Sequence, residues 1–377
     1  AGGHTMLKTF KYRIYPTKKQ VRIMSQWLEE CRWLHNYFLE ERRKAWEERK
    51  ESLSYHKQAK ELPELKKKRP SLTIVYSQVL QNVAVRVDLA FKHFFRRVKN
   101  GEKPGYPRFK SANRYKSFTY PQFGFKVSGD RLHLSGIGEV KIVLHRPLEG
   151  RVKTCTIKQT ATGKWFAIFA CEVETKHLPE NQEAVGIDIG LHSFATFSTG
   201  ECVEAPRFFR QEEKALAKAQ RKLSRLEKGT WEYERQRKVV ARIHERIAWK
   251  RHNFTHQLSR KIVNRFSIIA VEDIHANRMV HNHCLAKSIL DAAWSEFFSK
   301  LAYKAEEAGR KLVKVNPAYT SQDCSRCGHR QHMPLSERVF KCPCCGLELD
   351  RDYNAALNIL RLGLQSLGIQ PLEALSL

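Results

Sequence analysis

The first half of the chain carries strand and helix patterns in turn. Residues 7–15 alternate apolar and basic side chains, the two-residue period of a half-exposed strand. Apolar positions then recur every three or four residues over 17–51 and over 74–99, which predicts two amphipathic helices. Strand patterns dominate from 118 to 174, and they predict a small β-barrel that the first strand would complete.

The second half predicts a different domain. Apolar strands flank a turn at Gly190, and two further apolar strands alternate with helical patterns. This order of elements is that of a ribonuclease-H-like α/β domain. The predicted elements are strands at 185–189 and 193–198, one or two long helices over 210–265, a strand at 267–272, a helix at 286–308, a strand at 311–315 and a helix from about 352.

The composition indicates a folded protein with a polyanionic partner. The 377 residues include 68 Lys and Arg against 39 Asp and Glu, a net charge of +29. Hydrophobic residues make up 42% and aromatic residues 10%, which excludes a disordered basic tail. Nucleic acid fits such a charge better than a membrane surface or an acidic protein. Because no apolar run approaches about 18 residues and no signal peptide is evident, we expect a soluble intracellular protein.

The positive charge is concentrated in two segments. Residues 93–117 hold eight Lys and Arg against one acid, with five aromatic residues interleaved, and residues 210–265 hold seventeen against six. A surface that binds nucleic acid along its length needs cations to pair with phosphates and flat rings to stack on bases, and the segment 93–117 offers both. Arg108 and Lys110 are the candidate phosphate contacts in this nucleic-acid track. The alternative is a solvated loop whose aromatic rings belong to the core.

Two Cys-x-x-Cys pairs, fourteen residues apart, predict a zinc ribbon. Cys324 and Cys327 form the first pair and Cys342 and Cys345 the second, and each pair is followed by Gly. Four thiolates close a tetrahedral Zn²⁺ site, so this zinc would be structural. Cys344 is an alternative ligand, although the spacing favours Cys342 with Cys345.

Three acids lie where a charge is costly unless it is bound. Asp188 and Glu272 sit in apolar strands, and Asp352 opens the last helix. A single acid at such a place is often only a helix cap or an ion-pair partner, and Asp273 and Asp350 are the nearest competitors. Three acids in this order indicate more, because strands one and four of a ribonuclease-H-like sheet are neighbours and the closing helix reaches both.

Such a cluster suits metal-dependent phosphodiester hydrolysis. Two divalent ions about 3.5–4 Å apart activate the attacking water and stabilise the leaving oxygen. Carboxylate oxygens favour Mg²⁺, with Mn²⁺ as an alternative. The sequence therefore predicts a nuclease site at Asp188, Glu272 and Asp352.

Several motifs together resemble the TnpB family of transposon-encoded RNA-guided endonucleases, which is related to type V CRISPR effectors. The resemblance spans residues 8–362. Its motifs are Arg13-Ile-Tyr-Pro-Thr17 with Gln20, Gly105-Tyr-Pro-Arg-Phe-Lys110, Gly186-Ile-Asp-Ile-Gly190, Val271-Glu-Asp-Ile274, the paired cysteines and Asp352-Tyr-Asn-Ala-Ala-Leu-Asn-Ile359.

The resemblance implies a domain plan and assigns the site residues. The catalytic acids of the family fall on Asp188, Glu272 and Asp352, with Asp352 favoured over Asp350 by the Asn-Ala-Ala motif that follows, and the zinc ligands fall on the four paired cysteines. The implied segments are a first wedge strand at 6–16, a helical recognition domain at 17–100, a β-barrel wedge domain at 101–180, a RuvC-like nuclease domain at 181–319 and 348–377, and a zinc ribbon for target nucleic acid at 320–347.

The resemblance also implies the partners. A guide RNA from the transposon end would be bound, and base pairing would select target double-stranded DNA beside a short motif that the protein reads. Gln78 and Gln81 are candidates for reading adenine in that motif, although a simple place on the helix surface is at least as good an explanation. The implied protein is a monomer on its RNA in the prokaryotic cytoplasm, associated with the nucleoid.

Two alternatives remain at this stage. A guided DNA-binding repressor of the same ancestry would have lost cleavage, but such a protein would be expected to lack one of the acids. An unguided RuvC-like nuclease or transposase would share the metal chemistry, but it would need neither the helical domain nor the basic segment at 93–117.

Overall fold

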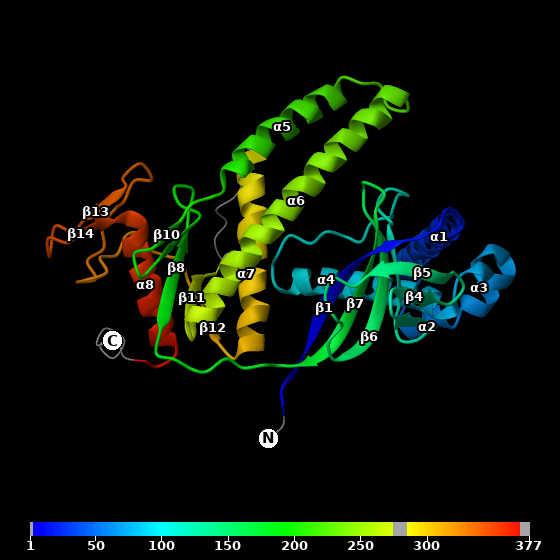
Figure 1. Ribbon diagram of the computed structural model, residues 1–377, viewed down its shortest axis with the longest axis horizontal. Coiled ribbons are helices and arrows are strands. Elements are labelled where there is room, and N and C mark those ends of the chain that lie inside the picture. Colours follow the sequence, from blue (N-terminus) through cyan, green and yellow to red (C-terminus); the bar gives the residue numbers. More distant parts are fainter. Residues whose placement is uncertain (1–2, 274–284, 370–377) are drawn as a thin grey trace. The chain divides into compact units, whose positions relative to one another are not determined.

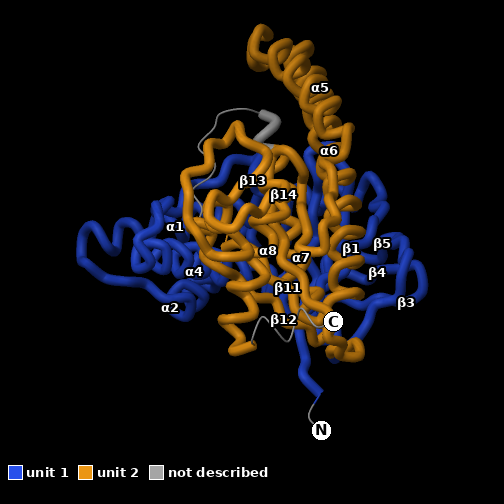
Figure 2. Tube along the Cα trace, turned by 90° about the vertical axis from the view of Figure 1, so that its left-hand side faces the viewer, with its two compact units in different colours: residues 1–174 blue, residues 175–377 orange. Residues whose placement is uncertain are grey.

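The chain forms two compact units, residues 1–174 and 175–377 (Figure 2). The computed structural model describes residues 3–273 and 285–369. Ile274 and residues 370–377, which belong to the motif and to the last segment named above, lie outside this range. Among the described helices, none is both long and apolar enough to cross a membrane.

The first unit is one antiparallel sheet with a group of helices between its first two strands (Figure 1). Its elements are β1 (Thr5–Tyr15), α1 (Lys18–Arg49), α2 (Tyr55–Ala59), α3 (Leu62–Lys68), the 3₁₀ helix η1 (Pro70–Ile74), α4 (Ser77–Lys99), β2 (Ser117–Tyr120), β3 (Phe125–Ser128), β4 (Arg131–Leu134), β5 (Gly138–Val143), β6 (Arg151–Gln159) and β7 (Trp165–Glu174).

The first strand lies in the middle of this sheet. The strand order is β2-β6-β7-β1-β5-β4-β3, and β1 pairs antiparallel with β7 and with β5. Its buried side chains Phe10, Tyr12 and Ile14 alternate with more exposed ones. The predicted near-barrel sheet with an N-terminal strand is therefore confirmed.

Helix α1 is fixed at its start and at its first buried turns. Thr17 caps the helix by accepting from the Gln20 backbone N–H, and the Gln20 side chain donates to the Glu139 carbonyl of β5 at 2.7 Å. Trp27 is fully buried, and a Cβ at Gly136 would lie 2.6 Å from its ring. The Pro-Thr-x-x-Gln sequence thus joins the strand, the helix and the sheet.

The helices differ in detail from the prediction. Helix α4 begins at Ser77 rather than at 74, because residues 70–74 form the 3₁₀ helix η1. The short helices α2 and α3 were not predicted, since five and seven residues are too few to show a helical period.

The second unit is a mixed α/β domain with a zinc-ribbon-like insertion before its last helix. Its elements are β8 (Ala184–Ile189), β9 (Ala195–Phe197), β10 (Cys202–Val203), α5 (Arg207–Ser224), α6 (Trp231–Arg265), β11 (Ile268–Glu272), α7 (Leu285–Ala308), β12 (Lys311–Val315), β13 (Val339–Lys341), β14 (Glu348–Asp350) and α8 (Arg351–Ser366).

The sheet of this unit has the predicted topology. Its strand order is β10-β9-β8-β11-β12, with β8, β11 and β12 parallel and β9 antiparallel to β8. Strands β8 and β11, the first and fourth in sequence, are neighbours as a ribonuclease-H-like fold requires. The fold class is therefore confirmed, and the basic stretch 210–265 contains two helices, α5 and α6.

The two faces of this sheet pack against different helices. Val185, Ile187, Ile269 and Val271 belong to a core shared with α5, α6 and α7. The alternate positions face α8, which passes so close to β8 that a Cβ on Gly186 would lie 2.3 Å from the Ala356 carbonyl oxygen. Because successive side chains of a strand point to opposite faces, Asp188 lies on the α8 face.

Candidate active site and zinc ribbon

Three acidic side chains, Asp188, Glu272 and Asp352, are buried at the ends of β8, β11 and α8; we call them the carboxylate cluster. The parallel register pairs Ile187 with Val271, which places Asp188 and Glu272 at the next positions along neighbouring strands. Their exposed fractions are 8% and 7%, and that of Asp352 is 9%. The three predicted site acids are thus brought together.

The start of α8 separates Asp352 from its competitor. The Asp350 carboxylate caps the helix, accepting from the backbone N–H of Asp352 at 2.9 Å and of Tyr353 at 3.1 Å. Asp350 is exposed, whereas Asp352 is buried and its charge acts on both Asp188 and Glu272.

Burial and mutual repulsion make Asp188 and Glu272 weaker acids than usual. Loss of hydration and the charges of Glu272 and Asp352 raise the pKa of Asp188 well above its usual range. Burial also raises the pKa of Glu272 to about 7, against the effect of hydrogen bonds from Asp188 and from the Thr320 hydroxyl, whose oxygen is 3.4 Å from Oε1. Both carboxyl groups therefore lose their protons less readily than free carboxylic acids.

This donor set fits divalent cations. Three carboxylates crowded in a low-dielectric place repel one another, and a bound hard cation removes the repulsion while using the same oxygens.

Sequence reasoning missed several residues around the carboxylate cluster. Arg338 forms an ion pair with the Asp352 carboxylate, and Thr320 bonds Glu272. The sequence does not single out either residue, because Arg338 is one basic residue among many and Thr320 comes close to Glu272 only once the chain has folded. Asn354 and Asn358 did have one: they share a face of α8 at four-residue spacing, and both are buried.

These two asparagines fasten the segment before the first cysteine pair to α8. The Asn358 amide donates to the carbonyls of Thr320 at 2.8 Å and Asp323 at 2.7 Å. The Asn354 amide also donates to the Asp323 carbonyl, at 2.8 Å, and its oxygen accepts from the Ser325 backbone N–H. The helix that carries Asp352 therefore also positions the turn that carries Thr320.

The four predicted cysteines form one cluster. The Sγ atoms of Cys324, Cys327, Cys342 and Cys345 all lie within 4.8 Å of one another, and two of the pairs, 324–345 and 327–342, are separated by 3.6 Å. Tetrahedral coordination with Zn–S bonds of about 2.3 Å places sulfurs about 3.8 Å apart. The cysteine cluster therefore fits a structural zinc ion.

The residues near the cysteine cluster are arranged as the spacing predicted. Gly328 and Gly346 have φ of 79° and 78°, the left-handed conformation that allows each tight turn. Cys344 is exposed and lies outside the cluster.

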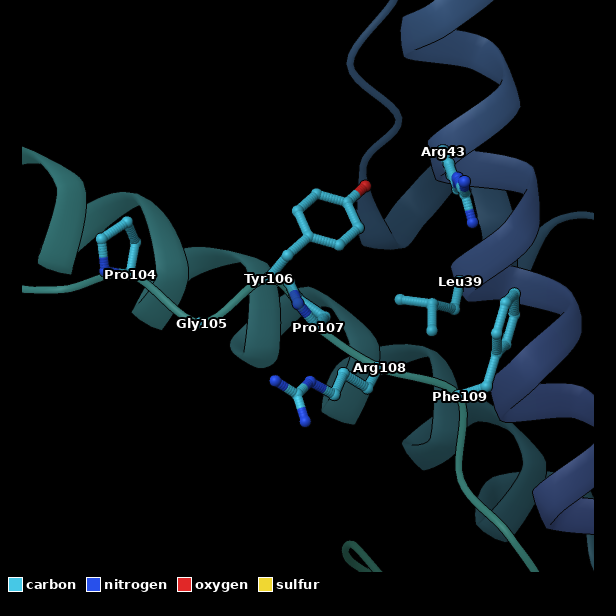
Figure 3. Close-up of a pocket in the computed structure, with 8 residues that line it drawn as sticks. All are labelled: Leu39, Arg43, Pro104, Gly105, Tyr106, Pro107, Arg108 and Phe109. Atoms are coloured by element: carbon cyan, nitrogen blue, oxygen red, sulfur yellow. The ribbon is translucent and has the colours of Figure 1, made fainter.

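The predicted nucleic-acid contacts lie in the first unit. Arg108 lines a hollow of about 340 Å³, together with Leu39 and Arg43 of α1 and the segment 104–109 (Figure 3). Lys110 is exposed, and its backbone N–H donates to Asn36 of α1 at 2.8 Å. The track is mixed in character, because Tyr106 and Phe109 are 45% and 49% exposed whereas Tyr115 is a core residue.

The two glutamines of α4 differ. The Gln78 side-chain oxygen accepts from the Phe123 backbone N–H at 3.2 Å, which gives it a structural contact. Gln81 is exposed, so its amide is accessible to a ligand.

Three known families match successive parts of the chain. Residues 6–51 match a family described as "Helix-turn-helix domain", residues 168–283 one described as "Probable transposase", and residues 294–359 one described as "Cas12f1-like, TNB domain". In this structure the first of these segments is strand β1 followed by one continuous helix, α1.

Relatives match over nearly the whole length. A protein of Streptomyces pristinaespiralis named "Putative RNA-guided DNA endonuclease" is 37% identical over 95% of this chain and 89% of its own. The Escherichia coli K12 protein named "Putative RNA-guided DNA endonuclease InsQ" is 31% identical over 95% and 92%. The Cas12f1 endodeoxyribonuclease of Sulfoacidibacillus thermotolerans is 30% identical over 59% and 56%.

Solved structures share the fold. A Cas12f1 in complex with single-guide RNA and target DNA aligns with a TM-score of 0.61 at 14% identity, over 94% of this chain and 98% of that one. The mini-RNA-guided endonuclease CRISPR-Cas phi3 aligns with a TM-score of 0.51 at 9% identity, over 96% and 93%.

The chain thus shares the fold of Cas12f1, with a near-barrel sheet, a ribonuclease-H-like domain and a zinc ribbon. Given the length and identity of the matches, the chain belongs to the TnpB family.

Proposed function

We propose that this protein is an RNA-guided DNA endonuclease that cleaves target DNA beside a short motif by metal-dependent hydrolysis. The carboxylate cluster carries the proposal, since three acids buried together are an unfavourable arrangement unless they bind cations, and the pKa values of Asp188 and Glu272 are raised by it. The names of the relatives support the guided activity on DNA.

We assign Asp188, Glu272 and Asp352 as the ligands of a two-ion Mg²⁺ site, which Mn²⁺ would also fit. Bound ions would activate water and stabilise the leaving oxygen. The Thr320 hydroxyl orients Glu272 by its hydrogen bond, and the raised pKa of Asp188 means that a proton competes with a cation for its carboxylate. The positively charged guanidinium of Arg338, which pairs with Asp352, would pair with a phosphate bound at the carboxylate cluster.

We further propose the six-segment domain plan and a guide RNA from the transposon end as the partner that neutralises much of the +29 charge. The exposed residues Arg108, Lys110 and Gln81 are the candidate residues of this protein for contacts to nucleic acid. Gln78 fits less well, because its oxygen already accepts from the backbone of Phe123.

The test is purification with and without the RNA of the flanking element, followed by Mg²⁺ and a guide-matched duplex. Cleavage only with a matched guide and an adjacent motif is the expected result. Tight guided binding without cleavage would make the protein a repressor, and cleavage without RNA would make it an unguided nuclease.

A variant pair tests the site itself. Asp188→Ala should abolish cleavage and leave RNA binding intact, whereas Asp350→Asn, which keeps a capping side chain outside the cluster, should still cut. Cleavage at the normal rate by Asp188→Ala would contradict the assignment.

A further inference from the structure

Tyr319 has a backbone conformation that its side chain does not favour. It occupies the third position of a turn in which the Thr320 N–H donates to the Pro317 carbonyl, and its φ is +65°. Gly and Asn usually take such a position, because a Cβ is strained there. The other non-glycine residue with positive φ in the described part of the chain is Lys50, which ends helix α1 and is explained by that role.

The ring of Tyr319 is exposed and covered on one face by a guanidinium group. The side chain is 49% exposed, and the Arg330 guanidinium carbon lies 3.6 Å from the ring centroid. Arg330 is held in place by two hydrogen bonds to the Asp323 carboxylate, at 2.8 and 3.3 Å. Two flat groups, an aromatic ring and a guanidinium, are thus stacked and fixed on the surface of the zinc ribbon.

This pair is rigidly connected to the carboxylate cluster. The next residue after Tyr319 is Thr320, whose hydroxyl bonds Glu272. The Tyr319 carbonyl accepts from the backbone N–H groups of Gln322 and Asp323, and Asn358 of α8 holds the carbonyls of Thr320 and Asp323. The backbone that carries the ring is therefore held by the same turn that brings Thr320 to Glu272.

An unpaired nucleobase fits this place. Bases stack on aromatic and guanidinium planes whatever their sequence, and a cation beside the ring suits the adjoining phosphate. Strain kept at one residue next to a reactive site indicates that the side chain has a use there.

We propose that Tyr319 and Arg330 form a stacking platform for one unpaired base of the DNA strand that enters the carboxylate cluster. The proposal rests on the nuclease function proposed above and adds a positioning site to it. The platform selects single-stranded DNA over a duplex, because both faces of a base inside a duplex are already stacked on its neighbours.

The test is binding of a single-stranded DNA oligonucleotide that contains 2-aminopurine, whose fluorescence changes on stacking. The full zinc-loaded chain is measured with Ca²⁺ in place of Mg²⁺, so that binding is read without cleavage. Tyr319→Asn tolerates positive φ but lacks the ring, whereas Tyr319→Phe keeps the ring and the strain. We expect Tyr319→Asn to bind about 5- to 100-fold more weakly and to lose the stacking signal, and Tyr319→Phe to keep both.

Zinc content and melting temperature are measured on the same samples. Trp46→Ala is the matched control, since it removes an exposed ring, 54% accessible, beside Lys50 on another element. Unchanged binding by Tyr319→Asn would overturn the proposal, and so would loss of zinc or a lower melting temperature in that variant, because the ring would then be structural.

The two proposals fail separately. If the stacking signal depends on the Tyr319 ring but the protein never cuts DNA, the proposed nuclease function is wrong and the platform stands. Guided cleavage with equal rates and equal KM in the wild type and Tyr319→Asn would remove the platform alone.

Discussion

The raised pKa values of Asp188 and Glu272 make the stability of the folded state depend on pH. Acids whose pKa is raised on folding destabilise the folded state as they ionise, so stability falls as pH rises from the unfolded value near 4.5 through the folded value of about 7 for Glu272. Bound cations remove this penalty, because they neutralise the ionised groups.

Asp188→Asn should therefore stabilise the protein in Mg²⁺-free buffer at pH 8. An amide still donates a hydrogen bond but cannot ionise, so the variant avoids the unfavourable ionisation of a buried carboxyl group as pH rises. The melting temperature should rise by about 2–4 °C for each kcal/mol gained, and Mg²⁺ should raise the melting temperature of the wild type but not of the variant. Glu180→Gln, an exposed acid of the same unit, should change neither value.

A second single-residue prediction concerns the cysteine cluster. Cys324→Ser should lower the zinc content from about one ion per chain to near zero, because three thiolates hold zinc poorly where four are arranged for it. Cys344→Ser is the control and should keep the full content, since its side chain lies outside the cluster. Elemental analysis of purified protein decides between the two, and equal zinc loss in both variants would contradict the ligand set.

Helix α8 is positioned by contacts that leave no room for a side chain. A Cβ on Gly186 would lie 2.3 Å from the Ala356 carbonyl and 2.6 Å from the Leu360 nitrogen, and a Cβ on Gly363 would lie 2.6 Å from the Ala270 Cβ. Two glycines, one on the strand and one on the helix, thus allow the close approach that brings Asp352 to the strand ends.

Gly186→Ala should lower the free energy of unfolding by about 1–3 kcal/mol, since backbone atoms must move to admit the methyl group. The matched variant is Gly190→Ala, where the nearest atom to the new Cβ is 3.8 Å away and little change is expected. Urea denaturation of both variants in the presence of Mg²⁺ measures the difference, and equal stabilities would show that α8 shifts freely.

The elements show what could be predicted from the sequence. Period-two and period-3.6 patterns located β1, α1 and the strands β8, β9, β11 and β12, and the order of strands implied that Asp188 and Glu272 would meet, whereas the two-residue strand β10 was not predicted. The contact between Thr320 and Glu272 could not be predicted from the sequence. The turn that carries Thr320 is held near the carboxylate cluster by hydrogen bonds from Asn354 and Asn358, and these form only in the folded chain. Gly186 was part of a recognised motif, but its use in packing against α8 depends on the three-dimensional approach.

Charge over the entire chain sets how the protein responds to salt. Helices α5 and α6 carry exposed Lys and Arg side chains, among them Lys214, Lys218, Lys238 and Arg242. If these contact phosphates, the logarithm of the binding constant falls linearly with the logarithm of the salt concentration.

The double variant Lys238→Gln and Arg242→Gln should reduce that salt slope by about 1.4 for single-stranded and about 1.8 for double-stranded nucleic acid, two released counterions in each case. Lys67→Gln, at an exposed residue paired with Glu64, is the control and should leave the slope unchanged. A filter-binding series across salt concentrations gives both slopes, and no difference between them would place the nucleic acid elsewhere.

The place of Asp352 on α8 has a consequence during protein synthesis. Asp188 and Glu272 are made first, and the third acid is translated eighty residues after Glu272. A nascent or prematurely terminated chain that ends between residues 272 and 352 contains the basic helices without the complete acidic cluster. Under the proposed function, such a product would bind nucleic acid without cleaving it, so synthesis itself delays the nuclease until the start of α8 has been made.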